Sequence, residues 1–425
     1  MLWLVVVGAL VAEDPVLPGA LPPLDDALLL GEGDAGGGAS VFGQGRIMGG
    51  AEDRDIVDDA DPIVAAALTG RLGVAGRIGD LRAAVVVGDG AWWTAPVEAS
   101  SSSSLVLVPR PVVAPLSRVS LEVPVGLFGA PGLLLLGRFP LVIADGRLVG
   151  SEPFDARGRS VDGALVDVEL GEVQARAGAV LLDLGALSLR DGDVVDEWSG
   201  LGFVAASTHV FDVALDLYGL VHHAGPAQLA RPTLGTRAVV DVVGLRWSAG
   251  LDGQLALDET NGADVVDSGV HAELGVRTLL PWSLRSPRPF LEVGLEGTGP
   301  LVAPAPTTHG TLGSLDLVGL SNTWQTRAAI GVDDDTGFSF KATWRLVSGL
   351  GKVRSPIGVV VGESSGPLFN ELDVDLCLPI DDDVGLDVAW SVALGRGLLP
   401  AGPAQRLIVG LKFSFGDDDG LLSSF

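Results

Sequence analysis

The sequence predicts an all-β protein, a transmembrane antiparallel β-barrel of about 16–18 strands. Apolar and polar residues alternate along most of the chain, as side chains on the two faces of a strand do. The alternating segments run for about ten residues or more, which suits a tilted membrane strand of ~9–11 residues better than a soluble strand of ~5–6. High hydropathy also accompanies high charge: 47% of the 425 residues are hydrophobic, mean hydropathy is +0.42, and net charge is −27.

The alternation is clearest in segments that each end at a turn signal. Leu245, Trp247 and Leu251 alternate with polar or small residues, and so do Leu407, Val409 and Phe413 in the last segment. Other clear segments are 211–218, 338–346, 371–378 and 384–394. Acidic glycine-containing stretches at 333–337 and 381–385 predict tight hairpin turns between such segments, with calcium binding as the alternative interpretation.

The ends of the chain differ from the alternating part. Residues 1–12 are apolar and suit the core of a signal peptide, since they are too few for a helix that spans ~30 Å of hydrocarbon. Residues 13–60 contain Pro15, Pro22 and clustered glycines, and predict an acidic linker. The barrel is expected over 61–415, with a short tail at 416–425. No stretch after residue 12 is apolar for 18 residues, so only a closed sheet satisfies every backbone group in lipid.

The polar faces of the predicted strands supply the candidate lumen residues. The acidic candidates are Asp167, Glu169, Asp212, Asp216, Asp373, Asp375 and Asp387. The basic candidates are Arg176, Arg237, Lys341 and Arg345, which could form a mixed-charge girdle with the acids. Because rings of Asp and Glu select cations, the acidic set predicts a cation-preferring pore.

Residues 132–168 carry the most specific pattern in the chain. They contain Gly137-Arg138 at a strand end, the turn Asp145-Gly146-Arg147-Leu148-Val149-Gly150, and Arg159-Ser160-Val161-Asp162-Gly163 at the next strand start. This pattern resembles the alginate-export family of outer-membrane barrels. The resemblance implies a bacterial outer-membrane channel and singles out Arg138, Asp145, Arg147, Arg159 and Asp162 as motif residues. Phe139-Pro140 departs from the family pattern, and an acidic lumen does not suit a polyanion.

The predicted function is a channel for passive diffusion or export of small or polymeric hydrophilic solutes. Its expected partners are outer-membrane lipid, the barrel-assembly machinery and the solute, and a monomer is expected. A non-conducting scaffold or receptor barrel and a soluble secreted ligand-binding β-protein are the alternatives. The acidic composition excludes duplex nucleic-acid binding.

No enzyme activity, metal or cofactor is expected. The string Gly362-Glu363-Ser364-Ser365-Gly366 fits the pattern of a nucleophile elbow. A nucleophile elbow requires a helix after the serine. An alternating segment follows here instead, which predicts a loop.

Overall fold

The structure is a computed structural model of the chain. It describes residues 38–53, 63–78, 80–96, 108–112, 116–143, 148–150, 160–182, 199–224, 229–242, 244–258, 264–280, 287–299, 322–334, 337–354, 360–381, 384–395 and 403–415. The predicted signal peptide at 1–12 and the tail at 416–425 lie outside these residues. Among the residues described, no helix has the length and apolar character needed to cross a membrane.

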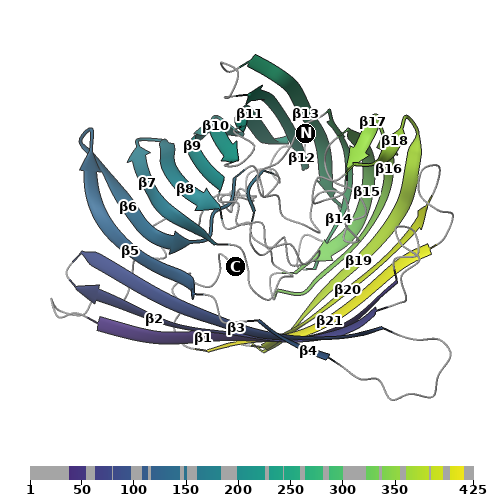
Figure 1. Ribbon diagram of the computed structural model, residues 1–425, viewed down its shortest axis with the longest axis horizontal. Coiled ribbons are helices and arrows are strands. Elements are labelled where there is room, and N and C mark those ends of the chain that lie inside the picture. Colours follow the sequence, from purple (N-terminus) through teal and green to yellow (C-terminus); the bar gives the residue numbers. More distant parts are fainter. Residues whose placement is uncertain are drawn as a thin grey trace, which may run out of the picture.

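Antiparallel strands follow one another around a ring (Figure 1). The first half of the ring comprises β1 (Gly38–Asp53), β2 (Ile63–Ile78), β3 (Leu81–Pro96), β4 (Val108–Val112), β5 (Leu116–Leu127), β6 (Ala130–Phe139), β7 (Val161–Leu170), β8 (Val173–Leu182), β9 (Ser199–Val210) and β10 (Val213–Ala224). The second half comprises β11 (Leu229–Val242), β12 (Leu245–Asp258), β13 (Asp264–Leu279), β14 (Arg288–Thr298), β15 (Thr323–Asp333), β16 (Ser339–Gly349), β19 (Pro367–Asp381), β20 (Val384–Gly395) and β21 (Pro403–Phe415).

The ring closes because the first and last strands pair. Gly43 of β1 lies opposite Phe415 of β21, and the register runs on to Asp53 opposite Gln405. Strands β4 and β5 pair with successive parts of β3 and act as one interrupted strand. Within the part of the chain that the structure describes, the barrel therefore has 18 strands, which confirms the predicted fold class and strand number. A separate hairpin, β17 (Gly351–Arg354) and β18 (Val360–Ser364), lies between β16 and β19.

Strand β1 lies within the segment that the sequence assigns to a linker. It pairs with β2 from Gly38 to Glu52, so the barrel begins before residue 61. The reason for the difference is compositional. Glycines at 43, 45, 49 and 50 interrupt the apolar alternation, and the signal of a strand is weak where side chains are absent. Backbone pairing with β2 and β21 stabilises β1 although its sequence lacks apolar alternation.

The rows of large apolar side chains lie on the outer face of the ring. Leu251, Leu274, Leu295, Trp344 and Trp390 are exposed, and the residues beside each of them along the strand point to the opposite face. A single-layer ring with an apolar outside is the arrangement expected of a barrel in lipid. It excludes the soluble alternative in which these rows share a dry interior.

Short turns join the strands at one end of the barrel, named here the short-turn end. Phe128 and Phe211 lie in two of these turns, at φ values of 54° and 57°, and both side chains are 96% exposed. The sequence predicts a strand from residue 211, but the turn between β9 and β10 occupies Phe211 and Asp212. The prediction for Asp212 as a strand residue of the lumen is therefore wrong: alternation alone does not distinguish a strand residue from a turn residue.

Candidate functional site: the inner wall

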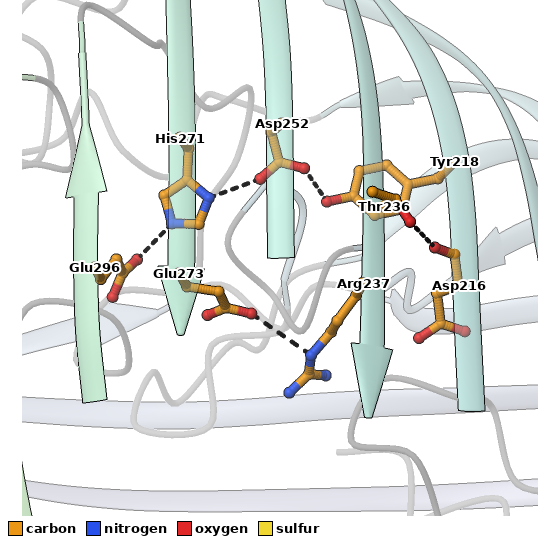
Figure 2. Close-up of polar contacts among 8 residues, drawn as sticks. All are labelled: Asp216, Tyr218, Thr236, Arg237, Asp252, His271, Glu273 and Glu296. Atoms are coloured by element: carbon orange, nitrogen blue, oxygen red, sulfur yellow. Dashed lines mark hydrogen bonds and ion pairs between the residues drawn. The ribbon is translucent and has the colours of Figure 1, made fainter. Parts of the chain in front are cut away.

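Polar side chains gather on the concave face of the ring, where side chains from neighbouring strands converge. Several contacts between charged or polar side chains skip a strand altogether. Tyr218 of β10 donates a hydrogen bond to Asp252 of β12, and Arg237 of β11 forms an ion pair with Glu273 of β13 at 3.6 Å (Figure 2). Arg277 of β13 likewise pairs with Asp333 of β15, Lys341 of β16 with Glu292 of β14, and Lys412 of β21 with Cys377 of β19. Contacts over two strand spacings require a concave surface, which identifies this face as the inner wall.

A chain of hydrogen bonds crosses the inner wall from β10 to β15. Tyr218 bonds Asp252, whose second carboxylate oxygen lies 2.9 Å from Nδ1 of His271. Nε2 of His271 lies 2.9 Å from Oε1 of Glu296, and Gln325 donates to Oε2 of Glu296 at 2.5 Å. All five side chains are buried. We name these five residues the His271 cluster; Figure 2 shows four of them.

Glycines on the intervening strands make the skipped contacts possible. A Cβ atom on Gly235 of β11 would lie 2.1 Å from Oδ1 of Asp252 and 2.4 Å from the Tyr218 ring. A Cβ atom on Gly250 of β12 would lie 2.8 Å from Oε1 of Glu273. Real Cβ atoms do not approach other atoms so closely, so any other residue at either position forces these contacts apart. The absence of a side chain at Gly235 and Gly250 is therefore required for the contacts that cross these two strands.

Basic side chains on β15, β16 and β21 are matched by acids on neighbouring strands. Glu292 accepts from Nζ of Lys341 at 3.3 Å and lies 3.4 Å from Nε of Arg327. Arg345 pairs with Asp373, and Lys412 lies 3.6 Å from Asp387. The Lys341 side chain is 40% exposed against 15% for Glu292, so the longer basic side chain covers the shorter acid.

Part of the inner wall formed by β6–β10 is apolar instead. Leu135, Leu165, Leu201, Phe203 and Leu220 share one buried cluster with residues of the connection that follows β6. Those residues are Leu141, Ile143, Leu148 and Val149, each no more than 7% exposed. Backbone hydrogen bonds join Ile143 and Val149 in both directions, at 2.8 and 3.4 Å. The connection after β6 thus folds back onto the inner wall and narrows the space inside the ring.

Most of the predicted lumen residues lie on the inner face. Asp167 bonds Arg176 at 2.7 Å, and Asp216 and Arg237 lie opposite each other in the register of β10 and β11. Asp373, Asp375, Asp387, Lys341 and Arg345 are on the inner face of β16, β19 and β20. Glu169 is on the same face as Asp167 but is exposed beside the short turn. Asp167, Asp373 and Asp387 each form an ion pair with a basic side chain of a neighbouring strand, which is the mixed-charge arrangement that the basic candidates allowed.

The motif residues divide into two groups. Arg138 of β6 donates two hydrogen bonds to Asp162 of β7, at 2.8 and 2.5 Å. Both residues alternate with the buried Phe139 and Val161, so the pair lies on the outer face and braces two strands. Asp145, Arg147 and Arg159 lie outside the described residues. Ser364, which belongs to the Gly362–Gly366 string with the pattern of a nucleophile elbow, ends β18. The next element is strand β19 and not the helix that an elbow requires.

Sequence reasoning did not single out Tyr218, Asp252, His271, Glu273 or Glu296. A usable signal was present: Asp252 occupies the polar face of a clean alternating segment, and Tyr218 is the single tyrosine of the chain. His271, Glu273 and Glu296 lie in segments where glycine and alanine dilute the alternation. Their contacts join strands that are distant in sequence, and no local pattern reveals such contacts.

No family model matches the sequence, and neither does any curated protein. Solved structures do match. The chain is similar to OccK7 of Pseudomonas aeruginosa, with a TM-score of 0.59 at 10% identity over 90% of this chain and 99% of that one. It is similar to OccD3 of the same organism, with a TM-score of 0.58 at 13% identity over 91% and 94%. The outer membrane protein OprD of P. aeruginosa gives a TM-score of 0.56 at 9% identity over 89% and 94%.

These similarities establish the fold, that of an outer-membrane β-barrel. The matched structures are OprD and Occ proteins and not alginate exporters, so the family resemblance predicted from residues 132–168 is not supported. The reason lies in what the motif does in this chain. Arg138 and Asp162 hold two strands together, and Leu148 and Val149 pack against the wall. These are local structural tasks that a short pattern can serve in barrels of different families.

Proposed function

We propose that the protein is an outer-membrane channel through which small hydrophilic solutes diffuse passively. One observation carries the proposal: a closed ring of 18 strands has exposed apolar rows outside and charged side chains inside. Barrels of 16–18 strands leave an aqueous channel. The similarity to OprD and Occ outer-membrane structures supports the same conclusion. The proposal includes outer-membrane lipid and the barrel-assembly machinery as partners, a monomeric state and the absence of enzyme activity.

We further propose that the pore discriminates weakly between small cations and anions. Some of the acids that would favour cations are compensated, since Asp167, Glu292 and Asp387 each face a basic side chain within 4 Å. Paired charges on a wall produce a local field across the pore but little net potential along it. The connection after β6 narrows the ring and favours small solutes over polymers.

Planar-bilayer recording of the refolded full chain tests both proposals. The expected result is a stable conductance, with a reversal potential in a tenfold KCl gradient well below the ~59 mV of an ideally selective pore. A near-ideal cation potential would restore the acidic-lumen interpretation and contradict the role given to the ion pairs. A correctly folded barrel that shows no conductance would contradict the channel and favour the scaffold alternative.

A further inference from the structure

The His271 cluster has a hydrogen-bonding pattern that fixes its proton content. Both ring nitrogens of His271 lie 2.9 Å from carboxylate oxygens, Nδ1 from Asp252 and Nε2 from Glu296. A carboxylate oxygen only accepts, and a neutral imidazole has one N–H and one lone pair. Two favourable contacts therefore require one proton more than a neutral ring and two carboxylates contain.

The remaining oxygens of the two carboxylates are also occupied by donors. The hydroxyl of Tyr218 donates to Oδ1 of Asp252, and the amide of Gln325 donates to Oε2 of Glu296. Neither carboxylate has an oxygen directed at another acceptor in this network. The ring nitrogens face carboxylates on both sides, so no lone pair is left on His271 for a metal ion. With one bound proton, every hydrogen bond within the cluster has a donor and an acceptor.

The surroundings make the extra proton necessary. His271 is 2% exposed, and two buried carboxylates without a cation between them would repel each other at high cost. The other charged groups nearby are already engaged. Glu273, two residues along β13, pairs with Arg237 of β11, and Arg327 of β15 pairs with Glu292 of β14. Arg345 of β16, whose charge also acts on Glu296, pairs with Asp373 of β19 and lies in the field of Glu371. With the proton, the cluster carries a net charge of −1; without it the charge is −2.

We propose that His271, Asp252 and Glu296 bind one proton as an imidazolium between two carboxylates, and that this proton ties β12, β13 and β14 together. The tie extends to β10 through Tyr218 (Figure 2). It extends to β15 through Gln325. Losing the proton removes one donor from the chain and leaves a carboxylate facing a lone pair. The barrel is therefore weakened at alkaline pH by a site that lies inside its own wall. This inference does not depend on conduction.

The sign of the pH dependence follows from proton linkage. An unfolded histidine loses its proton near pH ~6.5, so above that pH a folded chain that still holds the cluster proton binds more protons than the unfolded chain. The stabilisation is complete below pH ~6.5 and is lost as pH rises until the folded cluster also releases its proton. Within that range the folded chain binds one more proton than the unfolded chain. The unfolding equilibrium constant then rises up to about tenfold per pH unit.

Urea unfolding of the refolded barrel in detergent, between pH ~7 and pH ~9, tests this dependence. The wild type should lose stability with rising pH, and His271→Gln, which cannot donate in both directions from one position, should lose that slope. The matched control is His209→Gln, an exposed histidine on β9, which should keep the wild-type slope. Equal slopes in the wild type and His271→Gln would overturn the proposal.

Nitrogen-15 NMR of histidine-labelled wild type provides a test that needs no variant to fold. At pH ~8 an ordinary histidine is more than ~95% neutral. One of the five histidines should nevertheless show two protonated ring nitrogens, or a single shared proton with a carboxyl partner. Five ordinary neutral rings at pH ~8 would overturn the proposal and leave the channel function untouched. A barrel with this signal but without conductance would refute only the channel.

Discussion

Replacing Gly235 with alanine tests whether the inner wall depends on contacts that skip a strand. The new Cβ atom would lie 2.1 Å from Oδ1 of Asp252 and 2.4 Å from Cε2 of Tyr218, which flank it on β12 and β10. Neither neighbour can retreat freely, because Asp252 also bonds His271 and both are buried. The hydrogen bond from Tyr218 to Asp252 must therefore open.

The expected cost follows from the contacts that are lost. A hydrogen bond to a charged group contributes about 1.5–3 kcal/mol, and overpacking a tight site costs about 1–3 kcal/mol. Gly235→Ala should therefore lower the free energy of unfolding by about 2.5–6 kcal/mol. Urea titration of the refolded barrel in detergent measures this value, and heat-modifiable gel mobility verifies that the variant folds.

Gly253→Ala is the matched control for that experiment. Gly253 is next to Asp252 on β12, but it faces outward and has no atom within 4 Å of a Cβ position. Alanine is the better strand residue in open space, so stability should change by no more than about 1 kcal/mol. The reasoning is refuted if the two variants are equally stable. It is also refuted if Tyr218→Phe and Gly235→Ala destabilise additively, because both should remove the same hydrogen bond.

Three further predictions concern the faces and turns of the barrel. Cys377 lies on the inner face, with Nζ of Lys412 at 3.7 Å from its sulfur. A membrane-impermeant sulfonated thiol reagent should therefore reduce the conductance of the wild type but not of Cys377→Ser. An unchanged current after complete labelling would contradict this placement. Phe128→Asn should raise the free energy of unfolding by about 0.5–1 kcal/mol, because asparagine tolerates the left-handed conformation at φ 54° better than phenylalanine does. A variant that is less stable in urea would show instead that the exposed ring has a partner. Arg138→Gln should cost less than about 1 kcal/mol, because its ion pair with Asp162 is partly exposed and lies at the ends of β6 and β7, away from the middle of the outer face. It should also leave the reversal potential unchanged, and a shifted potential would place the pair in the pore.

Most of the barrel could be predicted from the sequence, and the inner wall could not. The strand period, the outward rows such as Leu251 and Trp344, and the closing strand that ends at Phe415 follow from alternation. Alternation is a local property: which side of a strand a residue faces depends only on its neighbours in the chain. The weak points were also local. The glycines of β1 interrupt the alternation that would predict a strand there. Phe211 lies in a turn whose sequence alternates as a strand does.

The tertiary structure alone decided what the inward side chains contact. The acids of the sequence indicated a negative pore, yet Asp167 and Asp387 face basic side chains that neighbouring strands supply. His271 meets Asp252 and Glu296 only because their strands are adjacent in the ring, and Tyr218 reaches Asp252 only over Gly235. Charge balance and proton binding depend on distances between residues far apart in the chain. Closure of the ring sets those distances, and a local sequence pattern contains no information about them.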